Sequence, residues 1–129
     1  MARILVVEDS LDNRDLLLVL LQRVGHEALA CADGAEGVAL AQQLLPDAII
    51  MDLRMPKMDG WTAVQLLKAD ARTARIPVLA VTANALREAE QRALAVGCDA
   101  FLIKPFRLAA LLTVLDSLLA RSSEVGGKP

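Results

Sequence analysis

The stretch Asp47-Ala-Ile-Ile-Met-Asp52 is the most informative part of this 129-residue chain. Its four central residues form an apolar run of strand length, which is typical of a buried parallel strand. Pro46 ends the helical pattern before this run, and Pro56 and Gly60 mark a turn after it. A buried strand that ends on an acidic residue and then turns predicts an α/β sheet with Asp52 at its carboxyl edge.

Apolar runs of similar length recur along the chain and alternate with stretches of helical spacing. We expect strands over residues 3–8, 27–31, 47–52, 77–82 and 100–103. We expect helices that contain or span residues 16–24, 34–45, 61–71, 86–96 and 108–119, with Gly25 and Gly97 as stops. Five βα units in succession predict a doubly wound, flavodoxin-like α/β fold, with five parallel strands and five helices on two faces. Right-handed crossovers favour the strand order 2-1-3-4-5.

Composition excludes several classes of protein. Aromatic residues make up 2% of the chain and the net charge is −2, which argues against binding to nucleic acid. No apolar run is long enough to cross a bilayer and no signal peptide is visible, so we expect a cytoplasmic protein without a membrane partner. Cys31 and Cys98 lack metal-ligand spacing, so we expect two buried or half-buried free thiols.

Polar residues interrupt the apolar pattern where the predicted strands end. Glu8 and Asp9 close the first strand, and Asp52, Thr82 and Lys104 close or follow the third, fourth and fifth. Because the carboxyl ends of parallel strands meet at one edge, all five side chains should converge beside the switch point between strands one and three. Convergent polar groups at such a point are typical of a ligand site.

Three carboxylates and one ammonium at one edge indicate a particular chemistry. Carboxylates a few ångströms apart repel by about 4 kcal/mol per pair at an effective dielectric near 20, so the cluster requires a cation or bound protons. An all-oxygen site with few protein ligands suits Mg²⁺. A carboxylate beside Mg²⁺ can also attack phosphorus and form an aspartyl phosphate, with the metal and the ammonium offsetting the phosphoryl charge.

These motifs resemble those of the response-regulator receiver domain family. The resemblance covers residues 1–121 and leaves 122–129 as a flexible C-terminal tail. It rests on the segments Val-Val-Glu8-Asp9-Ser, Ile-Met-Asp52-Leu-Arg-Met-Pro56, Met-Asp59-Gly60, Val-Thr82-Ala-Asn and Lys104-Pro105-Phe.

The resemblance implies a role for each acidic residue of the cluster. Asp52 would be the phosphoacceptor. Asp9 and Asp52 would bind Mg²⁺ directly, and Glu8 would bind it through water. The backbone carbonyl of Arg54 would complete the protein ligands.

The resemblance also implies the residues that bind the phosphoryl group and relay its presence. Thr82 would donate its hydroxyl to one phosphoryl oxygen, and Lys104, followed by a cis bond to Pro105, would pair with another. Phe101 stands at the family's switch aromatic position, although a plain core phenylalanine is the alternative.

Two further positions flank the path of the water that hydrolyses the phosphoryl group in this family. Here they are Arg54 and Asn84, so the sequence leaves the lifetime of the phosphorylated state open. Arg54 can equally be a solvated loop residue.

The function implied is that of a single-domain response regulator in a two-component phosphorelay. A histidine kinase or a histidine phosphotransfer protein would phosphorylate Asp52, and the fourth helix, fifth strand and fifth helix would then dock a protein partner. Such a chain accepts phosphoryl groups stoichiometrically and is not an enzyme in the usual sense. We expect a monomer or a weak dimer, with Mg²⁺ as the cofactor.

Two other classes share parts of this pattern. A flavodoxin-like electron carrier would need a Ser/Thr-rich phosphate loop and stacking aromatics, whereas this chain has Glu8-Asp9 at that place and no Tyr. A phosphohydrolase with an aspartyl intermediate typically has a second acid two residues after its nucleophile, where this chain has Arg54.

Other polar residues receive simpler interpretations. His26 follows a turn glycine and reads as a lone surface histidine. Ser10 and Asp12 read as helix caps, and Asp59 and Gly60 as turn residues, the glycine supplying an unusual φ.

Overall fold

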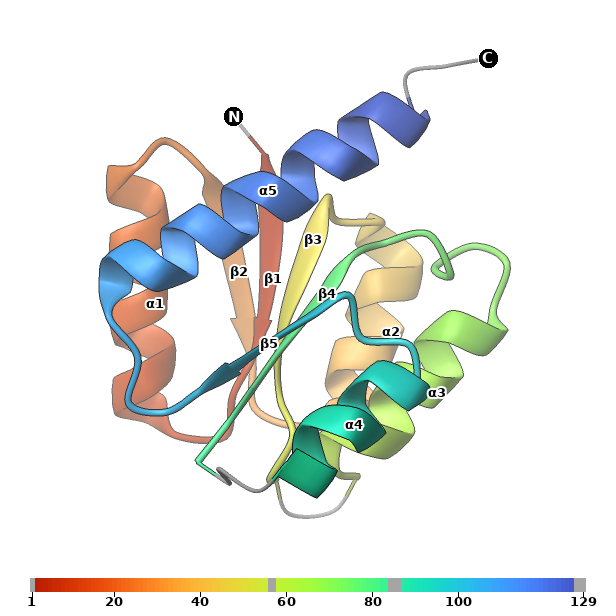
Figure 1. Cartoon of the computed structure of the whole chain (residues 1–129). Coiled ribbons are helices and arrows are strands. Elements are labelled where there is room, and N and C mark those ends of the chain that lie inside the picture. Colours follow the sequence, from red (N-terminus) through yellow and green to blue (C-terminus); the bar gives the residue numbers. More distant parts are fainter. Residues whose placement is uncertain (1, 56–57, 84–86, 127–129) are drawn as a thin grey trace.

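The computed structural model of this protein describes residues 2–55, 58–83 and 87–126, and for 87–88 and 122–126 it describes the backbone only. Five parallel strands form one sheet in the order β2-β1-β3-β4-β5, which confirms the predicted α/β topology (Figure 1). The strands are β1 (Arg3–Val7), β2 (Glu27–Cys31), β3 (Ala48–Asp52), β4 (Val78–Thr82) and β5 (Ala100–Ile103). The helices are α1 (Leu11–Arg23), α2 (Gly34–Leu44), α3 (Gly60–Ala69), α4 (Arg87–Ala95) and α5 (Leu108–Gly126).

Helices cover both faces of the sheet, so its central strands are buried on two sides. Helices α1 and α5 pack on one face, and α2, α3 and α4 pack on the other (Figure 1). Along β1, Ile4 and Val6 belong to the first of these cores and Leu5 and Val7 to the second. This alternation explains why the central strands read as uninterrupted apolar runs rather than as an apolar–polar repeat.

Capping residues fix where the helices begin. The side chain of Ser10 accepts a hydrogen bond from the backbone of Asn13 at 3.4 Å, so α1 begins at Leu11, ahead of its apolar stripe. The cap predicted at Ser10 is confirmed. Asp12 instead lies in the first turn, where a carboxylate complements the positive end of the helix dipole. Asp59, predicted as a turn residue, is the N-cap of α3 and accepts from the backbone of Thr62 at 2.8 Å.

The C-terminal ends of the helices differ from the predictions more than their starts do. Gly25 has a φ of 94°, the left-handed conformation expected of a residue that stops α1. Helix α5 continues to Gly126, past the boundary expected at residue 121, because neither proline nor glycine interrupts it earlier. The flexible tail stays a prediction, and residues 127–129 lie outside the described residues. Leu86, where we expected the fourth helix to begin, also lies outside them.

Both cysteines are buried free thiols, as expected. Burial raises the pKa of Cys31 and of Cys98 to about 12, so neither thiol ionises near neutral pH. In the part of the chain that the structure describes, no helix is both long and apolar enough to cross a membrane.

Candidate functional site

The sheet register brings the polar strand ends to one edge. Asp52, the last residue of β3, pairs with Val81 of β4, and Thr82 pairs with Ile103 of β5. Glu8 directly follows β1, and its backbone N–H donates to Cys31 at the end of β2. The strand ends are therefore level with one another, as the topology predicts.

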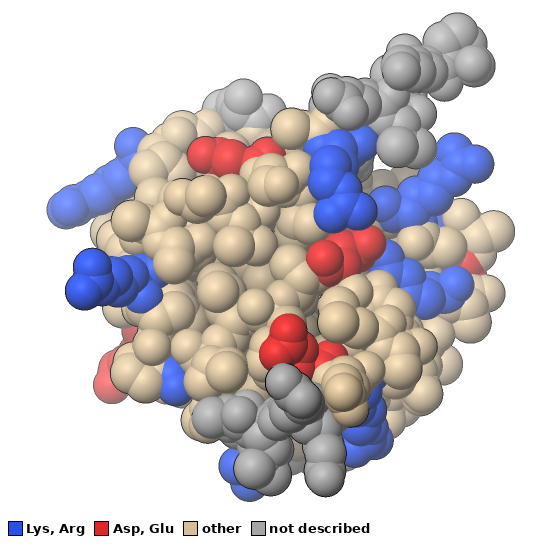
Figure 2. All heavy atoms as spheres, in the orientation of Figure 1, with Lys and Arg blue, Asp and Glu red and all other residues tan. Residues whose placement is uncertain are grey.

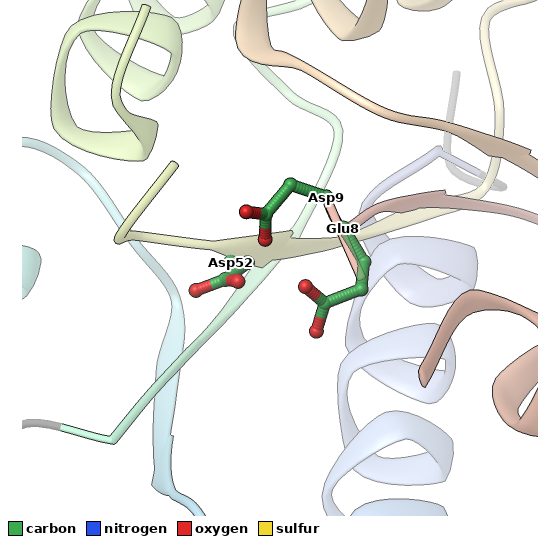
Figure 3. Close-up of side chains that lie close together, drawn as sticks. All are labelled: Glu8, Asp9 and Asp52. Carbon is green, nitrogen blue, oxygen red and sulfur yellow. The ribbon is translucent and has the colours of Figure 1, made fainter. Parts of the chain in front are cut away.

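Glu8, Asp9 and Asp52 form one carboxylate cluster at this edge, and Figure 3 shows their side chains pointing toward one another. One oxygen from each carboxylate lies within 4.8 Å of the other two. Glu8 is 2% exposed and Asp52 is 5% exposed, whereas Asp9 is exposed to solvent. The donor set is all oxygen and is open to solvent at Asp9, which suits a hard divalent cation.

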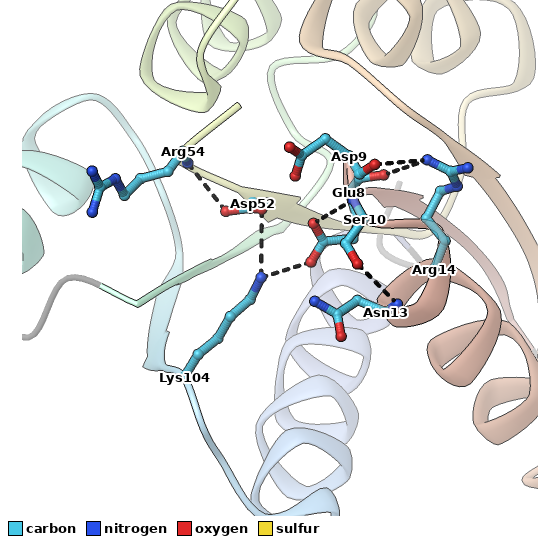
Figure 4. Close-up of polar contacts among 8 residues, drawn as sticks. All are labelled: Glu8, Asp9, Ser10, Asn13, Arg14, Asp52, Arg54 and Lys104. Atoms are coloured by element: carbon cyan, nitrogen blue, oxygen red, sulfur yellow. Dashed lines mark hydrogen bonds and ion pairs between the residues drawn. The ribbon is translucent and has the colours of Figure 1, made fainter. Parts of the chain in front are cut away.

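Lys104 supplies the positive charge of the site. Its Nζ lies 2.6 Å from Glu8 Oε1 and 3.4 Å from Asp52 Oδ2 (Figure 4). The peptide bond from Lys104 to Pro105 is cis, as predicted, and the Lys104 backbone N–H donates to the Thr82 carbonyl at 2.7 Å. One ammonium therefore faces three carboxylates, and the cluster keeps an excess of negative charge.

Backbone N–H groups bind the remaining oxygens of the two buried carboxylates. Ser10 N donates to Glu8 Oε2 at 3.2 Å, and Arg54 N donates to Asp52 Oδ1 at 3.1 Å (Figure 4). Hydrogen bonds from N–H groups to charged oxygens hold those oxygens in place. The two carboxylates are therefore fixed in orientation before any ligand arrives.

Arg14 is a site residue that the sequence analysis missed. Its Nη1 donates to the backbone carbonyls of Glu8 at 3.0 Å and Asp9 at 3.3 Å (Figure 4). This guanidinium ties α1 to the loop that carries two of the three carboxylates. Its position one turn into the helix is a usable signal, because helical side chains lean back toward the helix N-terminus.

Gly60 has a different role from the one expected. It lies at the start of α3 and does not have a positive φ. A Cβ atom there would approach the backbone of Leu53 at 2.6 Å, and Gly60 N donates to the Leu53 carbonyl at 3.2 Å. Glycine is needed for this close approach, which seats α3 on the backbone that follows Asp52.

The structure also places the other residues that the sequence singled out. Thr82 is buried at the end of β4, and Phe101 is half-buried, paired with Ala80 and packed against the core under α2, α3 and α4. Arg54 is exposed, although its backbone contacts Asp52. His26 is half-buried and lies at the opposite edge of the sheet, where its Nδ1 accepts from Ala2 N at 3.2 Å. Pro56 and Asn84 lie outside the described residues.

Burial and the neighbouring charges shift the pKa values of the residues in the site. Burial, together with the hydrogen bond to Glu8 and the charge of Glu8, raises the pKa of Asp52 to about 7. Burial also acts against ionisation of Glu8, but hydrogen bonds with Asp52, Lys104 and Ser10 outweigh it and lower the pKa of Glu8. For Lys104, the two carboxylates outweigh burial and raise its pKa. Of the two buried carboxyls, Asp52 is therefore the one that takes up a proton as the pH falls through about 7.

Comparison with known proteins agrees with this geometry. Residues 4–116 match the response regulator receiver domain family. The chain is 38% identical over 120 residues to Protein PilH of Pseudomonas aeruginosa, covering 93% of this chain and 99% of that protein. It is 39% identical over 125 residues to the DNA-binding dual master transcriptional regulator RpaA of Synechocystis, covering 97% of this chain but 52% of that protein, about half its length.

The chain also resembles a solved structure in its fold. It is the receiver domain of the sensor histidine kinase PA1611 from Pseudomonas aeruginosa, described with a magnesium ion coordinated in its active site cleft. Its TM-score to this chain is 0.86 at 34% identity, and the match covers 92% of this chain and 98% of that chain.

In the absence of divalent cations, we expect Asp52→Asn to stabilise the protein at pH 8 by roughly 1–2 kcal/mol, because it removes a buried charge. The pKa of Asp52 is raised from 3.8 to about 7 in the folded state. The stability that this carboxyl contributes is therefore complete below about pH 4 and is lost as the pH rises through about 7. The free energy of unfolding gained by Asp52→Asn should therefore increase as the pH rises from about 4 to about 7.

Urea denaturation across that pH range, in the presence of a chelator, measures this effect. Asp116→Asn, which neutralises an exposed carboxylate on α5, is the matched control and should show no such trend. A gain that is the same at every pH, or a loss of stability at pH 8, would contradict the assignment of the buried charge.

Proposed function

The chain belongs to the response regulator receiver domain family, and on this premise we propose that it receives a phosphoryl group on Asp52 within a two-component phosphorelay. The observation that carries the proposal is the convergence of three carboxylates with Lys104 at one edge of the sheet. Arg54, in place of a second acid two residues after Asp52, argues against a phosphohydrolase. The chain would act as a stoichiometric acceptor rather than as an enzyme that turns over an external substrate.

We propose that the carboxylate cluster holds one Mg²⁺ ion. Asp9 and Asp52 would bind it directly, the backbone carbonyl of Arg54 would add a third ligand, and Glu8 would bind through water. The chemistry of the donor set supports this, since Mg²⁺ favours oxygen ligands and one or two carboxylates. When bound, the ion would offset the negative charge that gathers around Asp52 during phosphoryl transfer.

The residues of the chain itself would then perform the transfer. A carboxylate oxygen of Asp52 attacks the phosphorus, and the bond between the phosphorus and the donor breaks. Lys104, which already contacts Asp52 Oδ2, pairs with one phosphoryl oxygen, and the hydroxyl of Thr82 donates to another. The backbone N–H of Arg54 keeps the acceptor carboxylate in a fixed orientation through the transfer.

The proposed donor is the phosphohistidine of a histidine kinase or a histidine phosphotransfer protein, in the cytoplasm. The downstream target would be a protein rather than nucleic acid. We propose that it docks on the surface of α4, β5 and α5, where Leu94, Ile103 and Leu108 are exposed. Figure 2 shows an area without charged residues on this side of the molecule, and the three exposed aliphatic side chains favour a partner with an apolar contact surface.

Incubation with Mg²⁺ and a small acyl or amido phosphate is expected to add one phosphoryl group to the chain, as seen by intact mass. Asp52→Asn should abolish the addition, because it removes the nucleophilic carboxylate, and so should a chelator. Asp59→Asn is the control: it alters a nearby carboxylate that caps α3 and should still be labelled. Undiminished labelling of Asp52→Asn would overturn the proposal.

Phosphorylation would become a signal through Thr82 and Phe101. Movement of the Thr82 hydroxyl toward the phosphoryl group vacates space beside β4, and Phe101, on the neighbouring strand, is the bulky side chain able to fill it. An inward Phe101 would reshape the surface of α4 and β5. The phosphoryl group then needs to favour the packing with Phe101 inward over the other packing by only a few kcal/mol.

Saturation with beryllofluoride and Mg²⁺, as a stable phosphoryl mimic, should shift the NMR resonances of α4 and β5. In Thr82→Ala we expect the resonances of α4 and β5 to shift by about half as much or less, because the hydroxyl that binds the phosphoryl group is missing and the hydrogen-bond network around that group is weakened. Asp52 should remain reactive. Thr113→Ala removes an exposed hydroxyl that bonds within α5 and should leave the shifts unchanged. Full shifts in Thr82→Ala would mean that the signal takes another route.

A further inference from the structure

Asp9 differs from the other two members of the carboxylate cluster in how it is held. Backbone N–H groups and Lys104 bind the carboxylates of Glu8 and Asp52. In the part of the chain that the structure describes, the Asp9 carboxylate accepts no hydrogen bond and forms no ion pair. It is also the exposed member of the three. Its place in the cluster therefore depends on the backbone that carries it.

Arg14 holds that backbone from the other side. Its Nη1 donates to the Glu8 carbonyl at 3.0 Å and to the Asp9 carbonyl at 3.3 Å, so it binds the peptide groups before and after the Asp9 Cα atom. Figure 4 shows the Asp9 carboxylate pointing away from this guanidinium. Arg14 thus fixes the main chain at Asp9 and leaves the carboxylate available to a cation.

The clamp is itself anchored in α1. Arg14 N donates to the Ser10 carbonyl at 2.9 Å in the first turn, and the Ser10 side chain caps the helix through Asn13 N at 3.4 Å. The Arg14 side chain is half-buried, so part of its conformational freedom is already lost before any ligand binds. The guanidinium is therefore a fixed support for the loop rather than a freely moving surface charge.

Building on the proposed magnesium site, we propose that Arg14 is a positioning residue that makes the carboxylate cluster select Mg²⁺ over Ca²⁺. Mg²⁺ demands near-ideal octahedral geometry from its ligands, whereas the larger Ca²⁺ accepts flexible arrangements of oxygen atoms. A fixed Asp9 suits the first ion, and a less constrained Asp9 can still bind the second. Loss of the clamp should therefore cost more affinity for Mg²⁺ than for Ca²⁺.

The charge of the guanidinium acts in the opposite direction to the clamp. A positive group beside the cluster repels a divalent cation, so its removal would tighten Mg²⁺ binding if charge were its only effect. Removal of the clamp instead weakens Mg²⁺ binding. The sign of the change in affinity therefore separates positioning from charge.

Calorimetric titration of the whole chain with Mg²⁺, and with Ca²⁺ in competition with Mg²⁺, is the test. We expect Arg14→Gln to lower the affinity for Mg²⁺ about tenfold, as when the support of a metal ligand is lost, and that for Ca²⁺ by less than about threefold. Arg14→Lys should also bind Mg²⁺ more weakly than the parent, because its ammonium keeps the charge on a shorter side chain without the planar fork of arginine.

Arg23→Gln is the matched control, because it removes the same charge from the exposed last turn of α1, at the other end of the helix from the clamp. It should bind both ions like the parent. Arg14→Lys, which changes the side chain less, keeps the test decisive if Arg14→Gln does not fold, as judged by urea denaturation in the presence of a chelator.

A Mg²⁺ affinity that is unchanged or higher in the Arg14 variants, or an equal loss of affinity for Mg²⁺ and Ca²⁺, would overturn this inference. Absence of saturable Mg²⁺ binding in the parent would instead overturn the proposed magnesium site on which it rests.

Discussion

The structure depends on one electrostatic constraint: three carboxylates meet at the end of the sheet, and within the described residues Lys104 is the one cation paired with the cluster, through Glu8 and Asp52. Two of the carboxylates, those of Glu8 and Asp52, are almost completely buried. Burial of charges that are not fully compensated costs stability, so the fold contains an energetic deficit at this point. A bound cation relieves that deficit, and without one the uptake of a proton by Asp52 relieves part of it.

The rest of the fold holds the cluster in position. The strand order places β1 directly beside β3, so that Glu8, Asp9 and Asp52 meet across one boundary of the sheet. Arg14 ties the loop after β1 to α1, and Gly60 lets α3 rest on the backbone after Asp52. Rigid placement of this kind matters because phosphoryl transfer relies on positioning and charge more than on covalent chemistry from the protein.

Periodicity explains what could be predicted from the sequence. The strands, their order and the convergence of Glu8, Asp52 and Lys104 follow from apolar runs and their polar ends. Contacts between distant residues leave no such pattern, so the stacking of Arg92 on Trp61 was not foreseen. The clamp from Arg14 was missed although it is local, because its signal is a side-chain direction rather than an apolar spacing. The cap at Ser10, which fixes the start of α1, was predicted, whereas α5 runs past its expected end because no helix breaker interrupts it. The role of Gly60 was misjudged because a close approach and a positive φ both call for glycine.

Calorimetric titration with Mg²⁺ tests the central claim most directly, because it asks whether the cluster exists to hold a cation. The parent should bind one ion, and Asp9→Asn should bind it at least about tenfold more weakly, as expected when a metal ligand or its close support is lost. Asp12→Asn removes an exposed carboxylate only three residues along and should bind like the parent. Equal affinity in Asp9→Asn and the parent, or no saturable binding at all, would contradict the account.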